Sequence, residues 1–240
     1  METENVVAER RQRWEARTGV ALLFASALFL LAYSLLVLVP QLATGWRIVM
    51  IVVLGVIWAA FIADLVVRVS LTPRAARAGF LRAHSAEVAS AVVPLFRPFQ
   101  LLRFLPRLRW FKGSSGDSVR SRIVVTALAY ATLFIYVIAL AVLAVERNAP
   151  HATILTFGNA IWWACVTVTT VGYGDFFPVT VAGRLLAVVL MAGGVAIIGT
   201  ASAIVVSYVS ERVSHAHEQV ANVGDDDATA ADGSRAQGRA

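Results

Sequence analysis

Charged residues are scarce in this sequence: they make up 15% of its 240 residues, whereas soluble domains carry about 25%. Cysteine occurs once, at Cys165, so no disulfide can form within the chain, and the redox compartment is left open. Apolar residues are abundant instead. They account for 58% of the chain, above the roughly 45–50% of ordinary soluble domains. This composition predicts a membrane protein.

Groups suited to catalysis are equally sparse. The four histidines, the single cysteine and the scattered acids show no spacing that would pair a nucleophile with a base or gather metal ligands. The chain also has neither a P-loop nor a dinucleotide-binding fingerprint. We therefore expect no enzyme activity and no cofactor.

The net charge of +6 comes from 20 arginines and one lysine, and these residues mostly flank apolar segments. Residues 1–18 carry four arginines and residues 68–82 carry four more, while the intervening loops are poor in them. This asymmetry predicts a multi-pass protein of the inner (plasma) membrane with both termini, the 70–82 loop and the 112–122 linker in the cytoplasm. Membrane lipid, rather than nucleic acid, is the expected partner of the basic charge.

Apolar runs of spanning length divide the chain into segments. Four runs have that length, 20–39, 48–69, 123–145 and 185–209, and two shorter helices are expected over 81–93 and 98–111. The apolar segment 157–168 is too short to cross a bilayer and is followed at once by glycines, as in a re-entrant segment. The predicted fold is an all-α membrane protein with six transmembrane helices, a re-entrant pore helix and a filter loop.

These segments group into five regions. We expect a cytoplasmic N-terminal segment (1–19), a voltage-sensor-like four-helix domain (20–112), a cytoplasmic linker (113–122), a pore domain (123–209) and a cytoplasmic tail (210–240). The tail is expected to be helical at first, with a weak heptad seam that could form a bundle, and disordered from Gly224.

Residues 170–174 read TVGYG, that is Thr170, Val171, Gly172, Tyr173 and Gly174. The two glycines permit backbone conformations closed to other residues, so successive carbonyl oxygens can point at one axis. Rings of such carbonyls from four TVGYG loops replace the hydration shell of K⁺. The helix before the loop would aim its partially negative C-terminal end at the cation path. The sequence thus predicts K⁺ bound at residues 170–173.

The run NAIWWACVTVTTVGYGDFFPVTVAGR, with LLAVVLMAGGVAIIG after it, resembles the pore and inner helix of bacterial potassium channels. The resemblance implies that Trp163 bonds Asp175 behind the filter and that Tyr173 packs against Trp162 and Trp163. Because each chain carries one filter strand, a channel of this kind requires a homotetramer.

The same resemblance places a gating hinge of the inner helix at Gly194, with Gly199 as a second weak point. A small residue can instead simply let two helices approach closely, so both interpretations of Gly194 stay open.

Basic residues recur at about every third position of 97–112: Arg97, Arg103, Arg107, Arg109 and Lys112. Arginines at this spacing within a membrane segment are typical of voltage-sensor helices. Pro106 interrupts the segment and should kink a helix there. A static helix whose arginines reach the cytoplasmic surface is therefore the alternative to a working sensor.

The candidate counter-charges are Asp64 and Glu87. Phe61, Asp64 and Arg68 match the F-x-x-[DE]-x-x-x-R pattern, which resembles the second helix of the sensor in voltage-gated channels. At the N-terminus, Trp14 and its neighbouring arginines could lie on the inner leaflet, although a plain positive-inside flank explains them equally well.

The function predicted from the sequence is passive, K⁺-selective and voltage-modulated conduction. A voltage-insensitive leak channel with an inert sensor-like domain shares the same pore and remains an alternative. A K⁺ transporter subunit is disfavoured because transporters of that kind carry several degenerate loops in one chain. A non-conducting scaffold is also disfavoured, because it would not require the backbone conformations that Gly172 and Gly174 permit.

Overall fold

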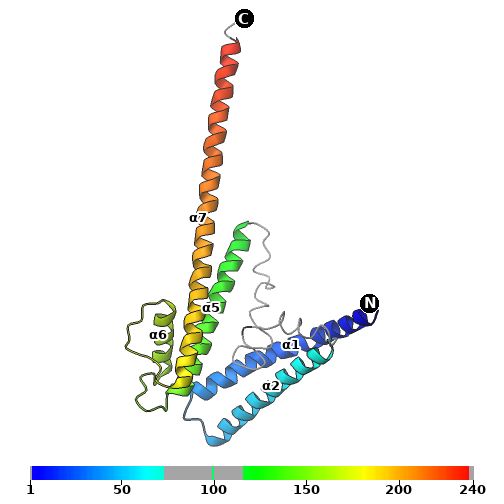
Figure 1. The fold of residues 1–240 in the computed structure, drawn as a ribbon, viewed down its shortest axis with the longest axis vertical. Helices are drawn as coiled ribbons and strands as arrows, with labels where there is room; N and C mark the ends of the chain where they lie inside the picture. The colour runs from blue at the N-terminus through cyan, green and yellow to red at the C-terminus, as the bar shows by residue number, and fades with distance from the viewer. Residues whose placement is uncertain (1, 73–98, 100–115, 238–240) are drawn as a thin grey trace. The chain divides into compact units, whose positions relative to one another are not determined.

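The computed structural model describes residues 2–72, 99 and 116–237. The described helices are α1 (Glu2–Leu38), α2 (Thr44–Ser70), α5 (Gly116–Glu146), α6 (Phe157–Val168) and α7 (Val181–Gln237) (Figure 1). Four of them contain stretches long and apolar enough to cross a membrane: Thr18–Leu38, Thr44–Ser70, Arg122–Glu146 and Val181–Ser210. An all-helical protein with four long apolar helices is thus confirmed for the described residues.

The observed bounds refine the prediction at several points. The re-entrant helix α6 has the predicted limits, 157 and 168. Helix α5 begins at Gly116, inside the segment expected to be a linker. Helix α7 continues through Gly224 and Gly233 to Gln237, where a disordered tail was expected; a glycine inside a helix costs only about 1 kcal/mol, so neither has to end it. The two shorter helices expected over 81–93 and 98–111 lie outside the described residues.

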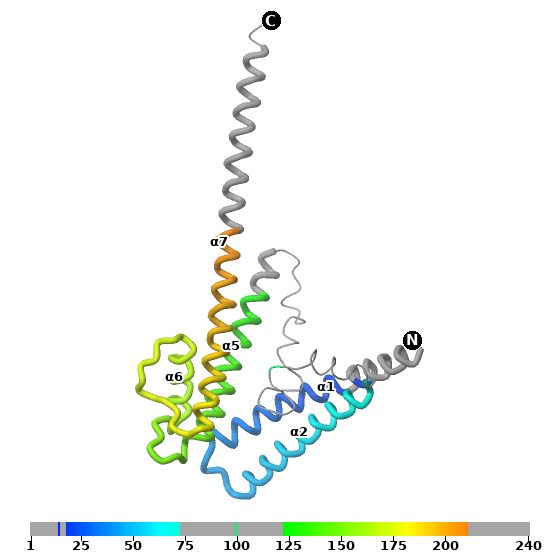
Figure 2. The backbone as a smooth tube through the Cα atoms, viewed as in Figure 1, coloured from blue at the N-terminus to red at the C-terminus, as the bar shows by residue number. Residues whose placement is uncertain are grey.

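Helices α1 and α2 form a hairpin around a small apolar core (Figure 2). The core consists of Phe29 on α1 with Ile57 and Phe61 on α2. Ile57, Phe61 and Asp64 are the buried residues of α2, and their spacing of four and three places them on one helix face. The polar residue Asp64 therefore shares the face that packs inward.

The larger core joins α5, α6 and the beginning of α7. It contains buried residues of α5 between 138 and 143, Ile154 of the following loop, Trp163 and Ala164 of α6, and Leu190 of α7. This packing holds the short helix α6 against two long ones, so the loop after α6 starts from a rigid base.

Two polar contacts tie α1 to α5. The hydroxyls of Ser34 and Tyr136 lie 2.8 Å apart, and Arg147 Nη1 donates to the carbonyl oxygen of Val37 at 2.7 Å. Val37 is also buried in the larger core. The helical hairpin is therefore attached to α5 and to the larger core of its own chain.

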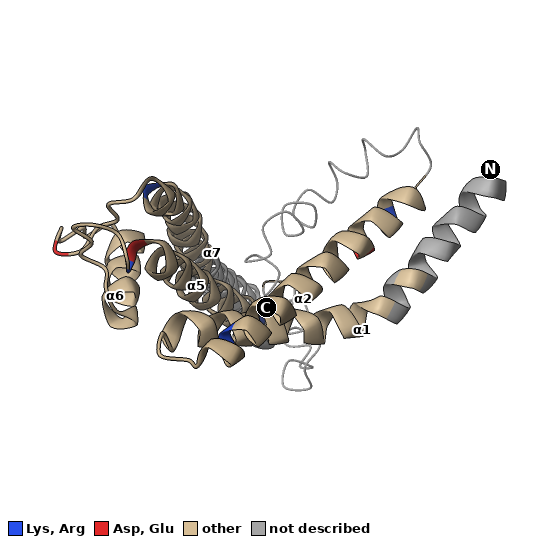
Figure 3. Ribbon diagram, turned by 90° about the horizontal axis from the view of Figure 1, so that it is seen from below, with Lys and Arg blue, Asp and Glu red and all other residues tan. Residues whose placement is uncertain are grey.

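Residues 1–194 form one compact unit and residues 195–240 a second. In the second unit, Val195, Val205, Val206 and Val209 are exposed. Charged residues are sparse along the coloured parts of the long helices (Figure 3). An apolar surface of this kind suits lipid or other copies of the chain, and the predicted four-stranded bundle stays a prediction.

Candidate functional site

Helix α6 is capped at both ends by groups close to it in sequence. The Thr156 side chain accepts a hydrogen bond from the backbone N–H of Asn159 at 3.2 Å, as at a typical helix N-terminus. At the other end the N–H of Thr169 donates to the carbonyl of Cys165 at 3.0 Å. The loop of residues 170–174 therefore leaves directly from the C-terminal end of the helix, where the partial charge is negative.

The first residues of the loop are hydrogen-bonded back to α6. The N–H of Thr170 donates to the carbonyl of Thr167 at 3.1 Å, and the N–H of Val171 donates to that of Val166 at 3.1 Å. A longer bond of 3.4 Å joins the N–H of Gly172 to the same Val166 oxygen. In a trans peptide the C=O points opposite to the N–H. The carbonyls of residues 169, 170 and 171 are thus directed away from the helix.

Every second residue of the loop has a positive φ: Thr170 at 60°, Gly172 at 59° and Gly174 at 77°. Glycine adopts this region without cost, whereas threonine is strained there by roughly 1–2 kcal/mol. The alternation explains why glycine occupies positions 172 and 174. It also shows that Thr170, which the sequence pattern did not single out for strain, is held in this conformation by its surroundings.

Aromatic residues of α6 support the loop from one side. Trp162 Nε1 donates to Asp175 Oδ2 at 2.8 Å, and the Trp162 ring stacks on Tyr173 with centroids 5.8 Å apart and parallel planes. The expectation that Trp163 bonds Asp175 is wrong. Adjacent helix positions point about 100° apart, and Trp163 faces inward with 5% of its surface exposed. Trp163 instead packs into the core that joins α5, α6 and α7.

The outer end of the loop is held by Thr153, which precedes α6. Its hydroxyl accepts from the N–H of Phe177 at 3.0 Å and donates to the carbonyl of the same residue at 3.0 Å. This pair joins the segment before α6 to the segment after the filter. The loop is therefore anchored on both sides of residues 170–174.

A buried acid, absent from the sequence-based candidates, links α5 to the start of α7. Glu146 is fully buried and accepts from the N–H of Val179 and the N–H of Thr180, each at 2.9 Å, and from the Thr180 hydroxyl at 2.6 Å. Thr180 in turn accepts from the N–H of Gly183 at 2.9 Å, and a Cβ on Gly183 would overlap the Glu146 carboxylate. The signal in the sequence was an acid at the edge of an otherwise uncharged span.

The two hinge candidates in α7 have different surroundings. A Cβ on Gly194 would lie 3.2 Å from the Cα of Val168, the last residue of α6, so this glycine allows a close approach of backbones. Gly199 has open space on that side among the described residues. Helix α7 is continuous through both positions. The close-approach interpretation therefore has a contact to support it at Gly194, and a hinge at either residue stays a prediction.

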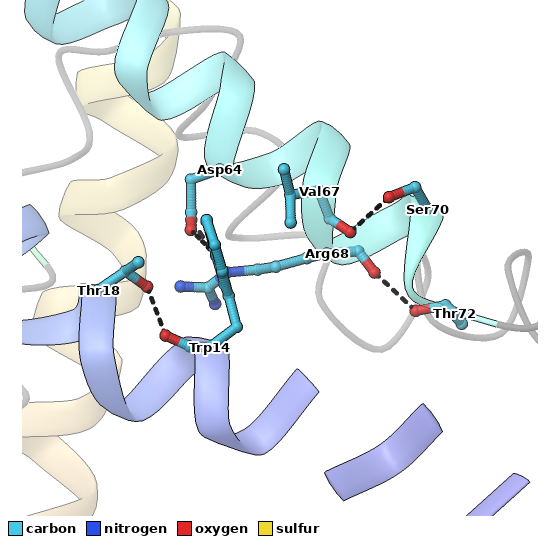
Figure 4. Close-up of polar contacts among 7 residues, drawn as sticks. All are labelled: Trp14, Thr18, Asp64, Val67, Arg68, Ser70 and Thr72. Carbon is cyan, nitrogen blue, oxygen red and sulfur yellow. Dashed lines mark hydrogen bonds and ion pairs between the residues drawn. The ribbon is translucent and has the colours of Figure 1, made fainter. Parts of the chain in front are cut away.

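The candidate sensor residues are only partly described. Phe61 is fully buried, and Asp64 accepts from Trp14 Nε1 at 3.0 Å through Oδ1 and pairs with Arg68 Nε at 2.9 Å through Oδ2 (Figure 4). Trp14 is thus attached to α2. Both Asp64 oxygens are engaged by residues of α1 and α2. Glu87 and the basic residues Arg97, Arg103, Arg107, Arg109 and Lys112 lie outside the described residues.

No group of three histidine, cysteine, aspartate or glutamate side chains that could hold a metal occurs in the described ranges 2–72 and 116–237. The groups that the loop offers a cation are backbone carbonyl oxygens and the hydroxyl of Thr170. Such hard oxygen donors suit an alkali or alkaline-earth cation that has lost its water.

A short helix packed between two apolar spans, followed by an anchored loop with outward-directed carbonyls, has the architecture of a re-entrant pore loop. Residues 122–211 match the protein-family model described as "Ion channel". This part of the chain is therefore similar to an ion-channel domain, and its long apolar helices have the length and composition to cross a membrane.

Among curated proteins, the chain is 29% identical over 179 residues to a cyclic nucleotide-gated potassium channel of Mesorhizobium japonicum, covering 67% of this chain and 49% of that protein. It is 41% identical over 63 residues to a calcium-gated potassium channel of Thermoplasma volcanium, covering 26% and 18%. It is also 41% identical over 68 residues to a voltage-gated potassium channel of Aeropyrum pernix, covering 27% and 23%. The chain thus spans about half or less of the length of these relatives, which are bacterial and archaeal potassium channels.

Proposed function

We propose that this chain forms a passive, K⁺-selective channel. The observation that carries the proposal is the backbone of residues 169–172, whose N–H groups bond back to α6 so that three successive carbonyls turn away from it. With the loop extended in this way, the carbonyls of Thr170, Val171, Gly172 and Tyr173 would replace the hydration shell of K⁺. The names of the relatives, all potassium channels, support the choice of ion.

Four copies of the chain are proposed to surround the conduction path. Each chain contributes one filter loop, and a ring of carbonyls around an ion needs four. In the single chain, Val171 and Tyr173 are exposed over 54% and 67% of their surfaces although the loop lies between apolar helices. A homotetramer would cover part of this surface.

The test of K⁺ selectivity is the reversal potential of the purified protein in a planar bilayer with K⁺ on one side and Na⁺ on the other. We expect reversal near the K⁺ equilibrium potential, because oxygen rings built for dehydrated K⁺ discriminate against Na⁺. A clear current that reverses near zero would reject the filter assignment. Chemical cross-linking in mild detergent tests the tetramer separately, through a ladder that ends at four chains.

We further propose that the domain 20–112 makes conduction voltage-dependent, with Arg97, Arg103, Arg107, Arg109 and Lys112 as moving charges and Phe61, Asp64 and Glu87 as their counterparts. A charge that crosses the whole field contributes about 2.3 kcal/mol per 100 mV. The short arginine segment and Pro106 predict a shallow dependence. A leak channel with an inert domain is the alternative, and the engagement of Asp64 by Trp14 and Arg68 is the observation that favours it.

Replacing Arg103 by glutamine distinguishes a working voltage sensor from a leak channel with an inert domain. In a working sensor it should lower the steepness of the open probability against voltage by about a fifth, since one of five charges is removed. Arg47→Gln, at the exposed start of α2, is the matched control and should leave the steepness unchanged. A parent protein whose open probability does not change with voltage would establish the leak alternative.

In this proposal the channel lies in the inner (plasma) membrane with both termini in the cytoplasm, following the arginine distribution. Gly199, and Gly194 if the contact with Val168 can loosen, would be the points at which α7 bends. Protease added to sealed vesicles of known orientation tests the topology, because only termini on the exposed side are cut.

A further inference from the structure

Phe99 forms an aromatic cluster with two residues of α5. Its ring stacks on Tyr130 with centroids 6.2 Å apart and an angle of 15° between planes. It also meets Phe134, at 6.3 Å and 55°. In the sequence Phe99 lies between Arg97 and Arg103, inside the candidate sensor segment. A residue of that segment therefore touches the outer helix of the pore domain directly.

Phe134 also touches α7, at a position where α7 has no side chain. A Cβ on Gly193 would overlap Cε1 and Cζ of the Phe134 ring and lie 3.3 Å from its Cδ1. The ring thus occupies the space that any other residue at 193 would fill. The next residue, Gly194, is the one whose backbone approaches Val168 at the base of the filter loop.

We propose that Phe99, Phe134 and Gly193 form a packed path that couples the candidate sensor segment to the inner helix α7. The proposal rests on the proposed function. Protein interiors are close-packed and transmit displacement between touching groups. A shift of Phe99 toward α5 would press on the Phe134 ring, which fills the space beside the α7 backbone at Gly193. This path would act beside the covalent connection through residues 113–122.

The first test uses size complementarity in the full-length protein, with single-channel open probability as the readout. Gly193→Ala should change the gating equilibrium about tenfold, because overpacking a tight contact strains one conformation more than the other. Phe134→Leu in the same chain should restore it toward the parent value, since the smaller side chain vacates the overlap. Phe29→Leu, at a stacked pair with Tyr33 in α1, is the matched control and should not restore it.

The second test leaves Gly193 unchanged, so it can show whether Phe99 and Phe134 are coupled even if the Gly193→Ala protein does not assemble. In a double-mutant cycle, Phe99→Leu and Phe134→Leu should be non-additive in the gating equilibrium by about two- to tenfold. Phe99→Leu combined with Phe29→Leu should be additive. Unchanged reversal potentials in all variants separate this effect from damage to the filter.

The outcomes for this path and for the filter are separate. Selective current with additive Phe99 and Phe134 effects would overturn the path while the channel proposal stands. A non-additive cycle in a channel that reverses near zero would support the path and reject the selectivity. The path would also be overturned if Phe134→Leu did not restore the gating of Gly193→Ala and the double-mutant cycle was additive. Phe134 would then only fill space between α5 and α7.

Discussion

Replacing Gly172 by alanine should abolish K⁺-selective conduction. Gly172 has a φ of 59°, and a Cβ in that region costs roughly 1–2 kcal/mol. In a ring of four chains the cost applies four times, about 4–8 kcal/mol in total. No atom of the described residues lies within 4 Å of the position where this Cβ would stand, so the expected loss comes from backbone strain in the loop and not from a clash within the chain. We therefore expect either no current or a current that has lost its preference for K⁺ over Na⁺.

Reversal potential and unitary current in planar bilayers measure this effect. Gly55→Ala is the matched control, because Gly55 lies inside α2 with open space around it and alanine favours a helix by about 1 kcal/mol. That variant should conduct like the parent protein and be slightly more stable. If Gly172→Ala retained both the current and the selectivity of the parent, the assignment of residues 170–174 as the filter would be untenable.

Removing the side chain of Glu146 should destabilise the pore domain by about 3 kcal/mol or more. The carboxylate is fully buried and accepts three hydrogen bonds, and bonds to a charged group contribute about 1.5–3 kcal/mol each without being additive. In Glu146→Ala the N–H groups of Val179 and Thr180 lose their acceptor inside the protein. The start of α7 would then be held to α5 by apolar packing alone.

Thermal unfolding in detergent, followed by helical circular dichroism, measures this loss. Glu146→Gln keeps one acceptor oxygen and should fall between the parent and the alanine variant. The matched control on the same helix is Thr126→Val, because Thr126 Oγ1 is buried with no hydrogen-bond partner among the described residues. That change should be neutral or mildly stabilising. Equal melting temperatures for Glu146→Ala and the parent would show that these bonds do not hold the two helices together.

The long helices and the filter loop could be predicted from the sequence because their causes are local. Twenty consecutive apolar residues satisfy the length of a bilayer whatever they pack against, so the four spans and α6 were predicted within a few residues. The glycines at 172 and 174 permit positive φ angles because they have no Cβ atom. Helix length and this backbone freedom depend on the local sequence and not on which helices pack together.

The pairing of polar and aromatic groups across helices could not be predicted in the same way. The resemblance of the pore segment pointed to Trp163 as the hydrogen-bond partner of Asp175, whereas the bond comes from Trp162, because the choice depends on how α6 is rotated against the core. Trp14, Asp64 and Arg68 were noticed separately, yet the indole donates across 50 residues to a helix that the sequence alone cannot orient. Glu146 was missed for the same reason.

By itself, then, the sequence determined that this protein has four helices long and apolar enough to cross a membrane, and that a TVGYG loop follows a short helix. Only the tertiary structure decided which side chains support that loop, that Glu146 attaches α5 to α7, and that Gly193 and Gly194 are sites of close approach. The physical reason is that the two kinds of feature depend on interactions over different distances along the chain. Hydrophobic length and backbone angles are properties of neighbouring residues, whereas hydrogen bonds and ring contacts depend on distances within about 3–6 Å, set by helix packing.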